Sequence, residues 1–175
     1  MLKTLRIFSA ALILASTAPL VHAYDFSATN SDGVLIYYDI KSDNTVYVAS
    51  GDDKYAGVVN IPSTVTNNGT EYTVAGVCCN FTNCTDLVEL NLPNTAKNIH
   101  ELCCAGLKKL RKVTLPEEID PFISTSYPHD EENPYICVIL SSTTFQDCSA
   151  LEEINIPTNC EFIGFGCVAS SGLKE

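Results

Sequence analysis

The sequence predicts a repeat solenoid, in which short strands stack into a parallel sheet, preceded by a small β-rich N-terminal cap. The main observation is a ten-residue pattern that occurs as CTDLVELNLP at 84–93 and again as CSALEEINIP at 148–157. A blunter copy, LKKLRKVTLP, lies between them at 107–116. This middle copy starts 23 residues after the first and 41 residues before the last. Because 41 equals 23 plus 18, the spacing predicts a 23-residue repeat with one insertion of about 18 residues.

Residues 1–23 predict a secretory signal peptide. Lys3 and Arg6 give a positively charged start, residues 7–20 are apolar, and Val21-His22-Ala23 is a small-residue cleavage site. We therefore expect cleavage after Ala23 and a secreted or cell-surface protein. The apolar stretch is too short to span a bilayer, and no later stretch approaches the roughly 18 apolar residues that a membrane helix needs. No transmembrane segment is expected.

The chain is acidic, with a formal net charge of −11 at pH 7. Loss of residues 1–23, which carry Lys3 and Arg6, changes this charge to −13. An acidic protein repels the phosphate backbone, so nucleic acid is not an expected partner. The charge also favours solubility.

Residues 24–56 do not match the repeat and predict the β-rich cap. Their runs GVLIYYDI and NTVYVAS are rich in Val, Ile and Tyr and are separated by the polar KSD. Next, VVNIPSTV predicts a strand that ends at Pro62, and TNNGTEYTV predicts a tight Asn-Gly hairpin turn. We expect repeats over 57–175, with the insertion at about 123–140 and an incomplete C-terminal repeat.

Each repeat contains the pattern L-x-x-L-x-L, in which alternation along a strand sends the last two apolar residues to one face. One repeat cannot bury this face alone, so stacked repeats form a continuous apolar ladder. The pattern predicts burial of Leu90, Leu92, Leu115 and Ile156. On the opposite face it predicts one exposed row that contains Asn91, Thr114 and Asn155.

The runs IPSTVTNNGTEYTVAGV, FTNCTDLVELNLP and FQDCSALEEINIP resemble the BspA-like leucine-rich repeats. The consensus of those repeats is close to I-G-x-x-A-F-x-G-C-x-x-L-x-x-I-x-I-P. The resemblance covers residues 57–175 and implies a leucine-rich-repeat fold with the parallel sheet on the concave face. It also implies a secreted or surface-exposed bacterial protein with a role in adhesion or protein-protein interaction. The chain departs from the consensus in its insertion, at its end, and at Cys103-Cys104, where the family has Ala-Phe.

Nine cysteines raise the question of disulfides or a metal site. Alignment of the repeats predicts three columns: Cys104 with Phe81, Phe145 and Val168; Cys103 with Asn80, Thr144 and Cys167; and Cys84 with Leu107, Cys148 and Ser171. A free cysteine packs as a small apolar group, which fits these columns.

Disulfide bonds are limited by the spacing of the repeats. Cys84 and Cys148 lie two repeats apart, about 10 Å at strand spacing, which is beyond disulfide reach. A bridge from Cys78 or Cys79 to Cys103 or Cys104 stays open. Because C-x-x-C is absent, we expect no metal and no cofactor.

The sequence predicts no catalytic site. Beyond residue 23 the only histidines are His100 and His129, and the chain lacks G-x-S-x-G, H-E-x-x-H and a Gly-rich phosphate loop. A Cys–His pair could be drawn between His100 and Cys103 or Cys104, but the column assignment indicates inert buried thiols.

Two surfaces are candidate binding sites. The outward strand positions form two rows, and an exposed sheet face on a solenoid commonly binds partners, although opposite charges on neighbouring strands can also simply pair. The insertion, with Tyr127 and Tyr135, is the second candidate, because long loops on a rigid scaffold often carry function; the alternative is a tolerated surface loop. The rows comprise Asn60, Asn91, Thr114 and Asn155, and beside them Glu89, Lys112 and Glu153.

We therefore expect a secreted or surface-exposed leucine-rich-repeat protein that binds a protein or glycan ligand, such as a host or extracellular surface component, without catalysis. One alternative is a structural N-terminal spacer segment of a longer surface protein, and another is a cysteine-dependent enzyme or redox protein. The last repeat stops at Glu175 before its strand. This predicts a fragment of a longer protein, or self-association through the open C-terminal end.

Overall fold

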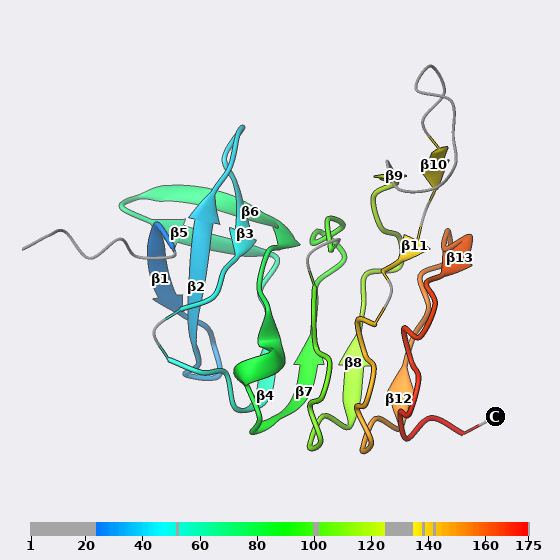
Figure 1. Ribbon diagram of the computed structural model, residues 1–175. Coiled ribbons are helices and arrows are strands. Elements are labelled where there is room, and N and C mark those ends of the chain that lie inside the picture. The colour runs from blue at the N-terminus through cyan, green and yellow to red at the C-terminus, as the bar shows by residue number, and fades with distance from the viewer. Residues whose placement is uncertain are drawn as a thin grey trace, which may run out of the picture.

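The computed structural model describes residues 24–51, 53–99, 102–124, 135–137, 139–141 and 143–174. Figure 1 shows an N-terminal sheet beside a row of stacked coils. The first sheet has the strand order β1-β2-β3-β6-β5, and the strands of the coils form a second sheet with the order β12-β8-β7-β4. Within the described ranges, no helix is long and apolar enough to cross a membrane.

The N-terminal sheet consists of β1 (Phe26–Thr29), β2 (Leu35–Ile40), β3 (Thr45–Val48), β5 (Thr64–Asn67) and β6 (Thr70–Val77). The antiparallel pairs β1–β2 and β2–β3 are followed by a parallel β3–β6 pair. β5 and β6 form a hairpin whose turn residues Asn68 and Gly69 both have positive φ, which confirms the predicted Asn-Gly turn. The two edge strands β1 and β5 lie close together, so that the sheet curls nearly into a barrel around its buried Ile, Val and Tyr side chains.

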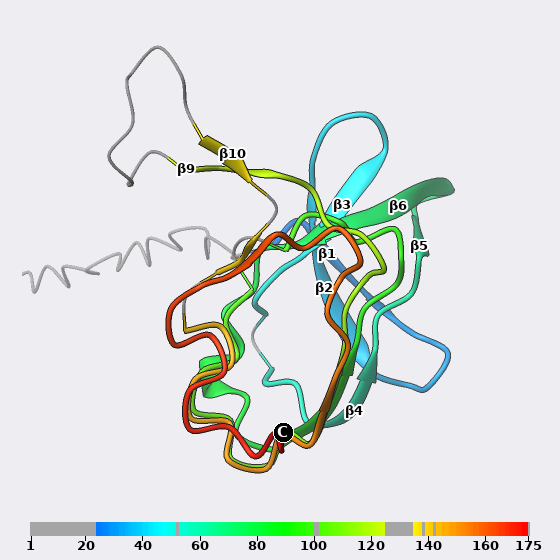
Figure 2. The ribbon, with the colours of Figure 1, turned by 90° about the vertical axis from the view of Figure 1, so that its right-hand side faces the viewer.

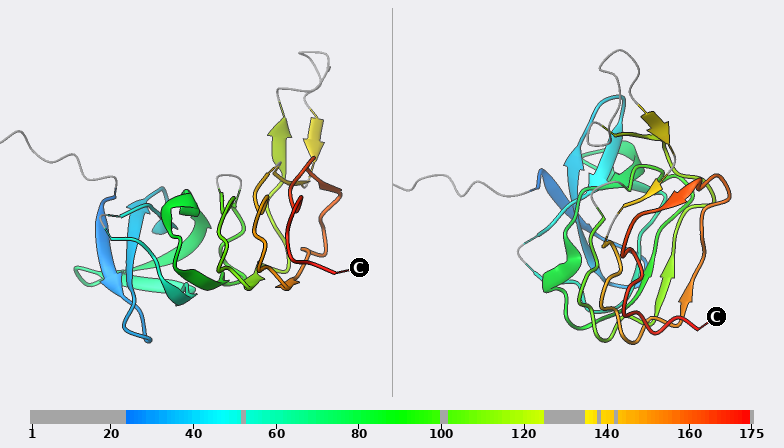
Figure 3. Two further views of the ribbon diagram at one scale, coloured as in Figure 1. Left: turned by 60° about the horizontal axis from the view of Figure 1, so that its bottom comes forward. Right: turned by 45° about the vertical axis from the view of Figure 1, so that its right-hand side comes forward.

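The chain crosses between the two sheets more than once. β4 (Gly57–Asn60) belongs to the sheet of the coils, whereas β5 and β6, which follow it, return to the N-terminal sheet. The two views in Figure 3 show this interleaving. A cap that ends at residue 56 and repeats that begin at residue 57 stay a prediction. After that boundary, β4 belongs to the sheet of the coils, whereas β5 and β6 belong to the N-terminal sheet.

The coils stack with their strands in parallel register. These strands are β7 (Leu87–Asn91), β8 (Lys112–Thr114) and β12 (Glu153–Ile154), beside β4. Leu90 pairs with Val59 on one side and with Val113 on the other, and Val113 pairs with Ile154. Leu90 and Val113 are buried, so this register produces the apolar ladder that the repeat pattern predicts.

The far side of each coil is a turn, and the turns also stack. The 3₁₀ helix η1 (Phe81–Asn83) is the first of them. Main-chain N–H groups of one coil donate to carbonyl groups of the next coil: Phe81 to Cys103 at 2.7 Å, Cys104 to Thr144 at 2.8 Å and Phe145 to Cys167 at 2.7 Å. These bonds confirm the predicted alignment of the cysteine-containing columns. Figure 2 shows the coils superposed.

A hairpin leaves the stack between the coils of residues 104 and 145. β9 (Phe122–Ser124) pairs antiparallel with β10 (Tyr135–Cys137), and Figures 1 and 3 show the hairpin projecting away from the coils. The chain then rejoins the stack through β11 (Ile139–Leu140), which pairs in parallel with β13 (Phe162–Ile163).

The predicted core is confirmed at three of its four test positions. Leu90, Leu92 and Leu115 are 0%, 5% and 2% exposed, but Ile156 is 43% exposed, so its predicted burial is wrong. The strand β12 ends at Ile154, and after it the side chain of Asn155, in place of the main chain, bonds the backbone of Leu115. Because the main chain has left the ladder there, Ile156 no longer follows the alternation of a strand.

We predict that Leu115→Ala lowers the free energy of unfolding by about 2–5 kcal/mol, because the substitution leaves a cavity in a closely packed core. Urea unfolding followed by circular dichroism measures this change. Lys109→Ala is the control, since Lys109 has a 63% exposed side chain in a surface ion pair; its loss should cost less than about 0.5 kcal/mol. Equal losses in the two variants would contradict the core position of Leu115.

Candidate functional site

Six of the predicted surface residues lie in two rows on the outward face of the parallel sheet. The strand register aligns Asn60, Asn91 and Thr114 in one row. It aligns Glu89, Lys112 and Glu153 in the other row. The sequence could place these residues because each occupies the same position of its repeat.

The first row is a directional chain of hydrogen bonds. Thr114 Oγ1 donates to Asn91 Oδ1 at 2.7 Å, and Asn91 Nδ2 donates to Asn60 Oδ1 at 2.8 Å. Asn60 Nδ2 in turn donates to Asp32 Oδ2 at 2.7 Å. This polar row therefore links three coils to the turn between β1 and β2 and is held in one conformation. We call Asp32, Asn60, Asn91 and Thr114 the amide row.

Asp32 in the amide row was not predicted from the sequence. It lies in the NSDG turn, where the Asn30 side chain accepts hydrogen bonds from the main chain of Asp32 at 3.0 Å and of Val34 at 2.9 Å. Asn30 Nδ2 also donates to the carbonyl oxygen of Asn60 at 2.8 Å. The sequence marks a turn at this place, but contact with a strand some 30 residues away leaves no local signal.

The second row is an ion-paired row. Lys112 Nζ lies 2.5 Å from Glu153 Oε1. The hydrogen bond to Glu153 and the charge of Glu153 raise the pKa of Lys112, and the charge of Glu89 adds to this rise. Further ion pairs also join successive coils: Lys109–Asp86, Lys97–Glu118 and Arg111–Glu152. Four basic side chains of the coils are therefore paired with acidic side chains of a neighbouring coil, as neighbouring strands allow.

Asn155 is exposed, as predicted, but its side chain bonds the backbone of Leu115 instead of joining the amide row. Its Oδ1 accepts from the Leu115 N–H at 2.7 Å, and its Nδ2 donates to the Leu115 carbonyl oxygen at 2.9 Å. Asn159 makes the same two bonds with Ile119, at 3.1 and 2.9 Å. Two carboxamides thus replace main-chain pairing along one side of the third coil.

We predict that Asn155→Ala lowers the free energy of unfolding by about 1–3 kcal/mol, because both backbone groups of Leu115 lose their partner. Urea unfolding measures the loss. Asn94→Ala is the matched control, because the Asn94 side chain satisfies a single exposed N–H, that of Glu117. A loss no larger than in this control would show that water replaces the Asn155 carboxamide without cost.

Of the two candidate residues in the insertion, the structure describes only the backbone of Tyr135. Tyr135 begins β10, where its backbone pairs with Ser124 in the projecting hairpin. Tyr127, the other candidate, lies outside the described residues, as does His100.

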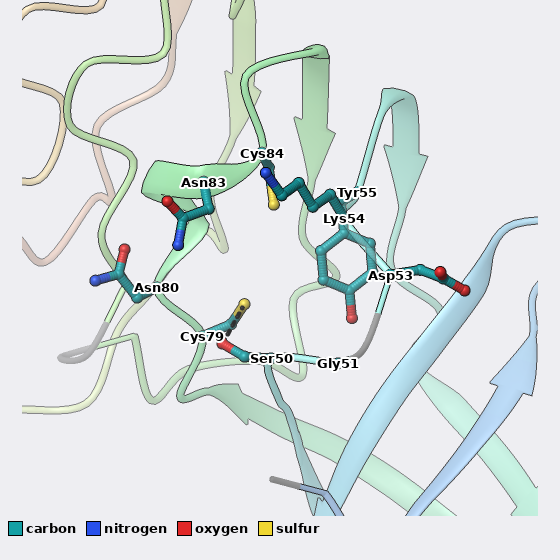
Figure 4. Close-up of a pocket in the computed structure, with 9 residues that line it drawn as sticks. All are labelled: Ser50, Gly51, Asp53, Lys54, Tyr55, Cys79, Asn80, Asn83 and Cys84. Atoms are coloured by element: carbon teal, nitrogen blue, oxygen red, sulfur yellow. Dashed lines mark hydrogen bonds between the residues drawn. The ribbon is translucent and has the colours of Figure 1, made fainter. Parts of the chain in front are cut away.

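A pocket of about 170 Å³ lies where the segment after β3 meets the first coil. Figure 4 shows the sulfur atoms of Cys79 and Cys84 and the ring of Tyr55 around it. Sequence analysis missed this site, because its two segments are distant in the sequence and the first of them is not a repeat. Its lining comprises Ser50, Gly51, Asp53, Lys54, Tyr55, Cys79, Asn80, Asn83 and Cys84.

Comparison with known proteins identifies the family. A family model described as a BspA type leucine rich repeat region, with 6 copies, matches residues 80–175, which is more than half of the chain. The chain belongs to this family. The match starts later than the resemblance in the sequence, which begins at residue 57, and so leaves out the segment in which the chain crosses between the two sheets.

Two solved structures are similar to this chain. A leucine-rich repeat protein from Bacteroides ovatus has a TM-score of 0.65 and 24% identity, over 86% of this chain and 34% of that one. A leucine rich cell surface protein from Faecalibacterium prausnitzii has a TM-score of 0.42 and 12% identity, over 85% of this chain and 47% of that one. The first similarity shows a leucine-rich-repeat fold, and this chain spans about a third of the length of that protein. No curated protein matches the chain significantly.

The cysteines of this chain form no disulfide bond at any position whose side chain the structure describes. The open question of a bridge from Cys78 or Cys79 to Cys103 or Cys104 is thereby answered for this structure. Cys78 Sγ instead donates to Asp39 Oδ2 at 3.3 Å, and Cys148 Sγ donates to the Cys104 carbonyl oxygen at 3.0 Å. Within the described part of the chain, no group of three or more His, Cys, Asp or Glu residues is arranged to hold a metal ion.

Burial keeps the inner thiols protonated. Burial raises the pKa of Cys79 to about 12, with a smaller opposing effect from the hydrogen bond to Ser50. Burial also raises the pKa of Cys84, and it raises the pKa of the fully buried Cys104 well above its ordinary value. Because the thiolate is the nucleophile and the metal ligand, these side chains are poorly suited to either role.

We predict that the protein becomes less stable as the pH rises from about 9 to 12. The unfolded chain releases thiol protons above its ordinary pKa near 9, whereas Cys79 keeps its proton in the fold until about pH 12. The unfolded state therefore binds fewer protons in this range, and the free energy of unfolding falls with pH. Urea midpoints measured with reductant present test this, and Cys79→Ala should reduce the decline. A midpoint that stays constant to pH 12 would contradict the burial of these groups.

Proposed function

We propose that this chain is a secreted or cell-surface protein that binds a protein or glycan partner through the outward face of its parallel sheet. The observation that carries the proposal is the amide row, in which four side chains of four different segments are fixed by hydrogen bonds. Binding usually costs entropy because surface side chains must be ordered. In the amide row this cost is already met in the free protein.

The adjoining ion-paired row extends this face. Lys112 is only partly exposed, and its partner Glu153 is exposed. A partner that meets the face therefore encounters amide, hydroxyl and paired ionic groups side by side. Such a surface favours polar, shape-dependent recognition in adhesion or protein-protein interaction, and it presents no activated nucleophile.

We also propose that the coils form a solenoid whose concave face carries this sheet, and that the N-terminal sheet is its cap. An uncapped solenoid would leave the apolar end of its first coil open. Here Tyr55, in the segment that follows β3, packs against Phe81 in the first coil. Their ring centroids are 5.4 Å apart, and both residues are buried. The interleaved strands β4 and β6 support the same role.

Secretion is proposed from the sequence. The predicted signal peptide, with cleavage after Ala23, lies outside the described residues. Its charged start, apolar middle and small-residue end are its support. Family membership supports the same location, as BspA-like proteins are mostly secreted or surface-exposed.

A structural spacer is the second candidate function. One observation favours it: the charged side chains of the coils pair with one another between coils. A spacer needs such stacking contacts and no free recognition groups. The third hypothesis, a cysteine-dependent enzyme or redox protein, is disfavoured by the burial and raised pKa of Cys79 and Cys104.

We predict that Lys112→Glu weakens binding about tenfold or more, because it places three acidic groups side by side in the row. Binding of the chain to a glycan array and to immobilised extracellular-matrix proteins measures this effect. Lys109→Glu is the matched control, with the same change of charge on a turn of the same coil.

Equal binding by the two variants would place recognition away from the sheet face. Failure of the unaltered chain to bind any glycan or matrix protein would favour the spacer.

A further inference from the structure

The two carboxamides of the amide row keep hydrogen-bonding groups that the row itself does not use. A carboxamide has two N–H bonds and two acceptor lone pairs. Asn91 donates one N–H to Asn60 and accepts one hydrogen bond from Thr114. Asn60 donates one N–H to Asp32 and accepts one hydrogen bond from Asn91. Each of the two side chains therefore offers a ligand one donor and one acceptor on the same group.

Both ends of the amide row offer acceptors. The Thr114 hydroxyl uses its proton toward Asn91, so the lone pairs of its oxygen remain for a donor. Asp32 accepts from Asn60 through Oδ2, which leaves Oδ1 for a ligand. A hydroxyl group both donates and accepts, so a ligand with many hydroxyl groups can satisfy every one of these sites.

The side chains of the amide row are accessible from solvent. Asp32 and Asn60 are exposed, and Asn91 and Thr114 are partly exposed. Their mutual bonds, of 2.7–2.8 Å, hold them in one arrangement before a ligand arrives. A ligand thus meets ordered groups and does not have to order them, which lowers the entropic cost of binding.

The spacing of the row selects the kind of polymer that fits it. Asn60, Asn91 and Thr114 lie on adjacent strands, which are about 4.8 Å apart. An extended polypeptide laid across the strands repeats its groups on one side only every second residue, about 6.7 Å, and is out of step with the row. A β-1,4-linked sugar chain presents hydroxyl groups on each edge at every ring, and the length of one ring is close to the strand spacing.

The row also has a defined length. It ends at Thr114, because the side chain of Asn155 on the next coil bonds the backbone of Leu115. The three strand positions therefore match about three sugar rings. Neither the amide row nor the ion-paired row contains an aromatic side chain, so the rings are held through their hydroxyl groups and the affinity is modest.

The charge of the face excludes acidic sugars. The two rows together carry Asp32, Glu89 and Glu153 against the one basic residue Lys112. The whole chain has a formal net charge of −11. An anionic ligand is repelled both by the face and by the rest of the protein.

We propose that the amide row binds an uncharged, extended glycan that lies along the stack of coils, with about one sugar ring to each strand. This inference rests on the proposed binding role of the sheet face and names the class of its ligand.

The test is an NMR titration of the ¹⁵N-labelled chain with β-1,4-linked oligomers of glucose, mannose, xylose and N-acetylglucosamine, from one to six rings long. We expect at least one series to give saturable shifts at the side-chain amides of Asn60 and Asn91. The Kd for three rings should be on the order of 1 mM. Affinity should rise about tenfold or more from one ring to three, and change by less than about twofold from three rings to six. The β-1,4-linked oligomer of glucuronate should bind at least about threefold more weakly than its neutral counterpart.

Two variants of one residue locate the binding site. Thr114→Val keeps the shape of the side chain and removes the hydroxyl, so it should weaken binding about threefold to tenfold. Thr114→Ser keeps the hydroxyl and should bind within about twofold of the unaltered chain. Thr66→Val is the matched control, because Thr66 is an exposed threonine on β5 of the N-terminal sheet; it should change nothing.

The absence of saturable shifts with every neutral oligomer up to about 20 mM would overturn the glycan inference. If the chain then still bound a matrix protein, with a loss in Lys112→Glu, the proposed function would stand without it. Affinity that does not depend on the number of rings, or equal binding by Thr114→Val and Thr66→Val, would also overturn the inference. So would binding of the glucuronate oligomer as tight as that of the neutral one.

Discussion

Main-chain hydrogen bonds between successive coils are the interaction on which the rest of this structure depends. One coil cannot bury its own apolar side, so it is stable only when the next coil covers it. Pairing on the strand side aligns Leu90 with Val113, and bonds on the turn side join Phe81 to Cys103 and Cys104 to Thr144. Because both the strand side and the turn side of each coil are held in register, the position of a side chain in its repeat determines which side chains of the next coil it contacts. The amide row and the ion-paired row are direct consequences of this register.

The same register extends into the N-terminal sheet through Gly76. In β6, Gly76 forms a parallel bridge with Asn98, and the Val77 N–H donates to the Asn98 carbonyl oxygen at 2.8 Å. A Cβ atom on Gly76 would lie 2.5 Å from that carbonyl oxygen, so a larger residue could not approach so closely. The last part of β6 thus belongs to the N-terminal sheet and also pairs with the first coil. This connection also brings the segment before β4 against the first coil, where the pocket forms.

The repeat spacing predicts what recurs in each coil and little else. The burial of Leu90 and Leu115 and the alignment of Asn60 with Asn91 follow from period and alternation. The exposure of Ile156 does not follow from period and alternation. It arises because the side chain of Asn155, and not the main chain, bonds the backbone of Leu115. Asp32 in the amide row and Tyr55 at the pocket were missed for another reason. Both lie outside the repeats, and long-range contacts of single residues leave no periodic signal.

The abundance of cysteine in the repeats has a packing explanation. Along the turn side, one column reads Phe81, Cys104, Phe145 and Val168, and its neighbour reads Cys84, Leu107, Cys148 and Ser171. Wherever the first column has a Phe the second has a Cys, and where the first has Cys104 the second has Leu107.

In the first three coils, these two columns therefore combine one large and one small side chain, and all six side chains are buried. Closely packed interiors tolerate substitutions that conserve total volume far better than those that do not. A thiol in this position serves as a small apolar group beside a large one. This accounts for a set of cysteines that remain unpaired and protonated in a chain whose sequence predicts secretion.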